Sequence, residues 1–112
     1  MTFQHAEQAA GKWNQRSLVE QMANIGSEIF RTISWRDKGN SEYSQAAFYR
    51  ALELFDLTKA DPKNIHRLKE VCRARELAVD YFFGDNVYHS DDDFWQRYFY
   101  YFNYAARIGR GV

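Results

Sequence analysis

Apolar and polar positions alternate with a helical period along most of this chain. From Ser17 onward, apolar side chains recur at steps of three and four residues, which places them on one face of an α-helix. The pattern breaks near Gly39, Asp61 and Gly84. It therefore predicts four helices, over residues 17–38, 41–60, 62–83 and 91–108.

Local signals mark the predicted helix ends. Ser17 and Glu20 have the spacing of a capping box, in which each side chain satisfies a free backbone N–H at the helix start. Ser90 and Asp93 repeat that spacing before the last helix. Pro62 suits the first position of a helix, because it has no backbone N–H to leave unpaired. These signals agree with the periodicity, which strengthens the assignment.

The order and length of these elements predict the fold class. Residues 1–16 are polar with no sustained period, so we expect a flexible N-terminal tail. Three short connections between helices of similar length favour antiparallel neighbours. A chain of 112 residues is one domain. We therefore expect an all-α single domain, an antiparallel up-down-up-down four-helix bundle built from residues 17–112.

The last predicted helix carries more rings than one face can bury. One face holds Phe94, Tyr98, Tyr101, Phe102 and Ala105. The adjacent face holds Trp95, Phe99, Phe102 and Ala106. The surplus rings could remain exposed to solvent at the edge of the core, or a second copy of the chain could cover them. Stacking of a ligand or nucleic acid on the rings is a third possibility.

Surplus aromatic surface also appears on the first predicted helix. Trp35 shares a line with Asn24, Glu28 and Arg31, on the polar side of that helix. Because aromatic residues are enriched at protein interfaces, we expect a homodimer or an unidentified protein partner. The candidate interface residues are Trp35, Trp95, Tyr100, Tyr101 and Tyr104.

Arg75 is the charged residue whose position is hardest to explain. Its helical neighbours three and four positions away are apolar, so the pattern directs Arg75 toward the core. A buried guanidinium needs a paired carboxylate, and Glu28 is a candidate partner. The pair is interpreted as a buried ion pair or, alternatively, as an anion-binding site between helices. In a third interpretation, the long Arg75 side chain extends so that its guanidinium reaches solvent at the rim of the core.

Bulk composition narrows the function classes. Fifteen basic residues balance fifteen acidic ones, so we do not expect nucleic acid as a general partner. Cys72 is the only cysteine, which excludes an intramolecular disulfide and favours a reduced, cytoplasmic protein. The sequence has no apolar stretch long enough to suggest a membrane span.

The sequence contains no complete metal-binding or cofactor-binding motif. The acid-rich segment starting at Asp85 fails as an EF-hand, because Ser90 replaces the glycine and Gln96 replaces the final glutamate. No phosphate-binding or nucleophile motif appears. We therefore expect no metal and no cofactor.

The plan of four helices resembles that of small bacterial all-helical proteins of the HEPN type. The catalytic mark of that family is an arginine followed four to six residues later by histidine. Here Arg97 is followed six residues later by Asn103, so the family motif lacks its histidine. The resemblance implies an RNA-processing or nucleotidyltransferase-associated protein, or an inactive relative, with Arg97, Asn103 and Arg107 as its nucleic-acid site. The residues themselves favour a non-catalytic protein that acts through protein–protein interaction, as a homodimer.

Overall fold

The computed structural model describes residues 6–110, and this part of the chain is helical without any strand. The helices are α1 (Ala6–Asn14), α2 (Leu18–Asp37), α3 (Ser41–Ala60), the 3₁₀ segment η1 (Pro62–Arg67), α4 (Leu68–Phe82) and α5 (Asp92–Arg110). The prediction of an all-helical single domain is confirmed.

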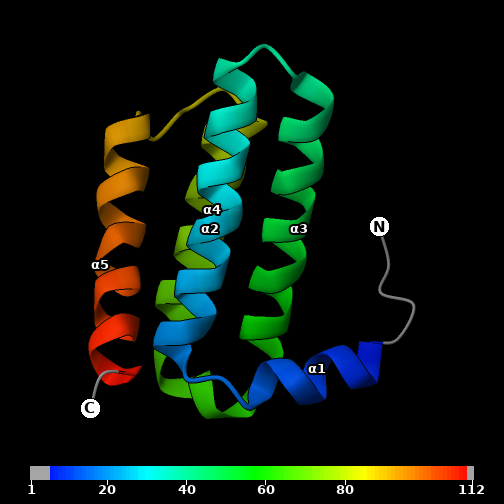
Figure 1. The fold of residues 1–112 in the computed structure, drawn as a ribbon, viewed down its shortest axis with the longest axis vertical. Helices are drawn as coiled ribbons and strands as arrows, with labels where there is room; N and C mark the ends of the chain where they lie inside the picture. Colours follow the sequence, from blue (N-terminus) through cyan, green and yellow to red (C-terminus); the bar gives the residue numbers. More distant parts are fainter. Residues whose placement is uncertain (1–5, 111–112) are drawn as a thin grey trace.

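The four longer helices lie along one direction, and the chain reverses at each connection between them (Figure 1). α2 packs closely against both α3 and α5, while α4 packs against α3. The backbones of α4 and α5 do not approach each other closely. Side chains of Trp95 and Tyr98 on α5 and of Leu77 on α4 line the space between these two helices. This side of the molecule is therefore more open than the other three.

The helix starts follow the local signals, with one change. The capping box at α2 is present: the Glu20 N–H donates to Ser17 Oγ (3.1 Å), and the Ser17 N–H donates to the Glu20 carboxylate (3.3 Å). At α5 the Phe94 N–H donates to Asp91 Oδ1 (2.8 Å), so Asp91 caps the helix in place of Ser90. The Ser90 hydroxyl instead accepts a hydrogen bond from the indole N–H of Trp95 (3.2 Å).

The predicted flexible tail is wrong for residues 6–14. Ala6–Asn14 forms α1, which lies at the lower end of α3 and extends sideways from the longer helices in Figure 1. Trp13 is only 7% exposed, and its indole N–H donates to Thr58 Oγ1 at the end of α3 (3.0 Å). One large apolar side chain thus anchors a helix whose sequence has no sustained apolar period. Residues 1–5 lie outside the described part of the chain.

The predicted helix 62–83 is divided into η1 and α4. Asn64 in η1 is buried, and its amide N–H donates to Gln21 Oε1 (2.8 Å) and to the Thr58 carbonyl (3.0 Å). These two hydrogen bonds hold η1 across the ends of α2 and α3. Ile65, an apolar residue of η1, is left 64% exposed.

Close packing of α2 against α5 depends on a glycine. A Cβ placed on Gly26 would lie 2.7 Å from the Cβ of Phe99, closer than side chains tolerate. The missing side chain at position 26 therefore lets α5 approach α2 closely. The largest fully buried side chains of the core include Met22, Ile25, Ile29, Phe48, Phe55, Trp95 and Phe99.

Candidate interaction surface on α5

The inner face of α5 supplies part of the core. Trp95 and Phe99 are fully buried, and Phe102 and Ala106 continue the same face toward the helix end. These four positions are separated by steps of four, three and four residues. Trp95 also packs near Phe82 of α4, with ring centroids 6.4 Å apart.

A second stripe follows the opposite side of α5. Its positions are again three or four residues apart, and we call it the outer stripe: Phe94, Arg97, Tyr101, Tyr104 and Ile108. The four apolar or aromatic members are between 37% and 75% exposed, with Tyr101 the most exposed. Tyr100, beside the stripe, stacks on Tyr104 at a centroid distance of 6.5 Å. α5 therefore presents a continuous aromatic surface to solvent.

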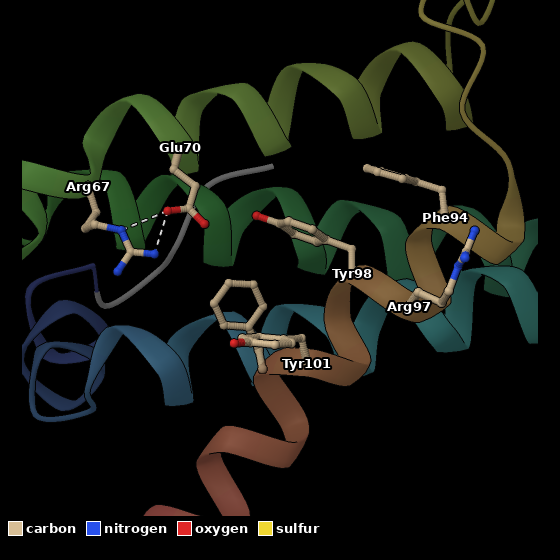
Figure 2. Close-up of a pocket in the computed structure, with 7 residues that line it drawn as sticks. Arg67, Glu70, Phe94, Arg97, Tyr98 and Tyr101 are labelled. Atoms are coloured by element: carbon tan, nitrogen blue, oxygen red, sulfur yellow. Dashed lines mark hydrogen bonds and ion pairs between the residues drawn. The ribbon is translucent and has the colours of Figure 1, made fainter.

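An α4–α5 groove adjoins this stripe. It has a volume of about 490 Å³ and is lined by Arg67, Glu70, Phe94, Arg97, Tyr98, Tyr101 and Phe102. Figure 2 shows the Tyr98 ring directed from α5 toward Glu70 on α4, with Arg67 beside Glu70. Phe94 and Arg97 lie at the other end of the groove. The outer stripe and the groove thus form one surface that is wider than α5 alone.

Charges around the groove are paired within the chain. Arg67 Nε donates to Glu70 Oε2 (2.8 Å), and Arg97 forms an ion pair with Asp93 (2.7 Å). Burial raises the pKa of Tyr98 to about 12, and the nearby Glu70 carboxylate adds to this rise. The Tyr98 hydroxyl therefore stays neutral at physiological pH. The groove combines apolar walls with compensated charges at its rim.

The start of α5 is fixed to the rest of the molecule by Asp92. Its carboxylate accepts hydrogen bonds from Arg36 of α2 (3.1 Å) and from the Tyr81 hydroxyl of α4 (2.6 Å). The Arg36 guanidinium lowers the pKa of Asp92, and the same contact raises the pKa of Arg36. Burial, followed by the bond to Asp92, raises the pKa of Tyr81. These bonds join three helices at the upper end of the surface.

The proposed Arg75–Glu28 pair is not formed, which corrects that prediction. Arg75 Nε donates to Asp56 of α3 (2.9 Å), and the Arg75 side chain is 31% exposed rather than buried. Glu28 pairs with Arg31 on its own helix and with Arg50 on α3. The face of α4 that carries Arg75 looks toward the α3 edge rather than into the centre of the core. Neither residue is therefore a buried anion site.

The candidate interface residues divide into three groups. Trp95 is fully buried within the chain, so its assignment to an interface is wrong. Trp35 is half-buried, with Tyr43 edge-on at 4.9 Å and the Lys38 ammonium 5.0 Å from its ring. Its surplus surface is thus partly covered by its own chain. The exposed candidates are Tyr100, Tyr101 and Tyr104.

Only two of the three residues of the alternative nucleic-acid site are brought together. Arg97 borders the α4–α5 groove. Asn103 and Arg107 border a separate hollow of about 220 Å³ beside Asn24 on α2. The six-residue step from Arg97 to Asn103 turns the second side chain onto another side of the helix. The geometry therefore brings Asn103 and Arg107 together and leaves Arg97 apart from them.

Sequence reasoning missed two parts of this surface. Phe94 and Ile108 complete the outer stripe, and their three- and four-residue spacing from Tyr101 and Tyr104 was a readable signal. Arg67 of η1 and Glu70 of α4 come from other elements, and only the folded chain brings them to Tyr98. Within residues 6–110, no three His, Cys, Asp or Glu side chains form a metal-binding cluster. No helix in this range has the length and apolar character needed to cross a bilayer.

Comparisons with known protein families, with curated proteins and with solved structures find no match to this chain.

Proposed function

We propose that this protein is a non-catalytic, cytoplasmic helical scaffold that acts through protein–protein interaction and forms a homodimer. α2 to α5 form an antiparallel four-helix bundle that is more open between α4 and α5. The observation that supports the proposal most directly is the outer stripe, where Phe94, Tyr101, Tyr104 and Ile108 expose apolar surface along one helix. Contiguous apolar patches on soluble proteins mark interaction sites.

The chemistry of the surface favours a protein partner. Tyrosine rings offer large contact area at a small cost in side-chain entropy, and their hydroxyls tolerate water before association. Arg67 and Arg97 each have a carboxylate beside them, which reduces their attraction for phosphate. The formal net charge of zero provides little long-range repulsion between copies. Each of these features favours self-association over nucleic-acid binding.

Sedimentation equilibrium at micromolar concentrations tests the proposal. We expect the wild-type protein to behave as a dimer. The double variant Tyr101→Ser/Tyr104→Ser should raise the dissociation constant at least about tenfold, because central aromatic side chains carry much of the energy of an interface. Val87→Ser is the matched control, since it removes a similarly exposed apolar side chain from the loop between α4 and α5.

Two results would count against the proposal in different ways. A wild-type protein that remains monomeric over the whole concentration range excludes the homodimer. A dimer that the double variant leaves unchanged moves the interface away from the outer stripe. Circular dichroism of both variants shows whether a change in association comes from a loss of helix.

A further inference from the structure

We infer that two copies associate with their α5 helices antiparallel, around a two-fold axis that passes beside Tyr101. This inference deepens the proposed function and rests on it, because it specifies the arrangement of a dimer. Residue 101 is the midpoint of α5 (Asp92–Arg110), and Tyr101 is the most exposed large apolar side chain of the described residues. A two-fold axis at the midpoint lets each helix cover the full length of the other.

The spacing of the outer stripe suits packing of one helix against another. Phe94, Arg97, Tyr101, Tyr104 and Ile108 alternate steps of three and four residues. This alternation has an average repeat of 3.5 residues, which keeps a seam facing a partner helix. In an isologous dimer the same stripe is used by both copies, so a single self-complementary surface is sufficient.

Antiparallel pairing matches side chains in size along the stripe. Residues equally far from Tyr101 then lie at the same level, so Phe94 meets Ile108 of the second copy. Arg97 lies level with Ala105 of the second copy, whose small side chain leaves room for the guanidinium. The two Tyr101 rings meet at the axis. The two most apolar ends of the stripe therefore cover each other.

Charge decides between the antiparallel and parallel arrangements. Asp93 and Arg107 lie two heptads apart on the same flank of the stripe, and both are exposed. In the antiparallel dimer, Asp93 of each copy lies near Arg107 of the other, and the helix dipoles oppose each other favourably. Parallel pairing in register would bring Arg97 of one copy against Arg97 of the other across the seam. Like charges at such positions destabilise the pairing.

Cysteine cross-linking tests the orientation directly. In a Cys72→Ser background, Phe94→Cys and Ile108→Cys variants are each oxidised alone and as a mixture. We expect a disulfide-linked dimer from the mixture and little from either variant alone, because antiparallel pairing separates like positions at the ends of α5. Tyr101→Cys alone should cross-link across the axis. Val87→Cys reports the background from random collisions.

The outcomes separate this inference from the proposed function. Efficient cross-linking of Phe94→Cys with itself would overturn the antiparallel arrangement, even while sedimentation still shows a dimer. A dimer in sedimentation that no α5 cysteine cross-links above the Val87→Cys background would overturn it as well. A monomer in sedimentation removes the proposed homodimer and this arrangement together.

A charge exchange gives a second test that does not remove apolar side chains. Arg107→Glu should weaken dimerisation by about tenfold, because two attractive pairs become two repulsive ones at exposed positions. Adding Asp93→Arg in the same chain should restore most of the affinity in the antiparallel dimer. If the second change weakens association further, Asp93 and Arg107 do not face each other and the arrangement is wrong.

Discussion

Gly26 of α2 lies directly beneath Phe99 of α5, and a Cβ at position 26 would come within 2.7 Å of the Cβ of Phe99. Both residues are buried, and Phe99 belongs to the inner face of α5. This contact sets the distance between the two helices. It also determines which side of α5 is left to face solvent.

Gly26→Ala should lower the free energy of unfolding by about 1–3 kcal/mol, because the added methyl overpacks a close helix contact. Urea unfolding followed by circular dichroism measures the change. Gly11→Ala is the matched control: the position is exposed in α1, with nothing within 4 Å of an added Cβ. There, alanine should stabilise the helix by up to about 1 kcal/mol. Equal effects at both positions would show that the α2–α5 contact is looser than described.

Asn64→Ala should lower the free energy of unfolding by about 1–3 kcal/mol, because Gln21 Oε1 and the Thr58 carbonyl lose a buried donor. Asn24→Ala is the control, since that half-buried amide donates only to the Glu20 carbonyl of its own helix. Its effect should stay below about 0.5 kcal/mol. Similar urea midpoints for the two variants would show that the buried Asn64 amide does not hold η1 in place.

Asp92→Asn should destabilise the protein at neutral pH by about 1–2 kcal/mol, since a carboxylate that accepts bonds from Arg36 and Tyr81 becomes a neutral amide. The folded-state pKa of Asp92 lies below its unfolded value, so its stabilising effect is present above that unfolded value, about 3.9. It is lost as the pH falls through the folded pKa.

Urea unfolding from pH 7 into the acid range tests this pH dependence. The gap between wild type and Asp92→Asn should close below about pH 4. Asp85→Asn, at an exposed loop position, should follow the wild type throughout. A gap that persists unchanged in acid would mean that the Asp92 charge has no part in the effect.

The partly buried Tyr98 should ionise near pH 12, because burial and the Glu70 carboxylate raise its pKa. The pKa is higher in the folded state than in the unfolded state. Stability from the neutral hydroxyl is therefore complete below about pH 10 and is lost as the pH rises through the folded value. Tyrosinate absorbance should show a late step that Tyr98→Phe removes and Tyr100→Phe leaves in place. Loss of that step in Tyr100→Phe would contradict the assignment.

Removal of residues 1–14 should lower the free energy of unfolding by about 3 kcal/mol or more, because a buried tryptophan and its bond to Thr58 are lost. A flexible tail would be removed without effect. Trp13→Phe separates the two contributions, since it keeps most of the apolar volume and deletes the indole N–H. Its cost should be about 1 kcal/mol. An unchanged urea midpoint for the truncated chain would show that α1 is dispensable.

Features that depend on neighbouring residues were predictable from the sequence. Ser17 and Glu20 cap α2 as their spacing indicated, and the apolar period located the helices. Features that depend on distant residues were not. Asn64 contacts Gln21, which is 43 positions away, and nothing near Asn64 indicates that η1 interrupts the helix.

The surface of α5 illustrates the same limit. Rings surround much of this helix, so its sequence alone does not say whether Trp95 or Tyr101 faces the core. The contact between Gly26 on α2 and Phe99 places that face of α5 against the core, and Trp95, four residues before Phe99, is buried on the same face. Exposure of Tyr101 follows from that choice. The candidate interface could therefore be proposed from sequence but not divided into buried and exposed members.

The three tryptophans lie in three different surroundings, which makes them separate optical reporters of the molecule. Trp13 is buried beside a hydroxyl at the end of α3, Trp95 lies among other rings, and Trp35 is half-buried under a lysine. Variants that keep one tryptophan each would therefore emit at different wavelengths. Coincident fluorescence transitions in all three would show that α1, the upper end of α2 and the aromatic core unfold as one cooperative unit.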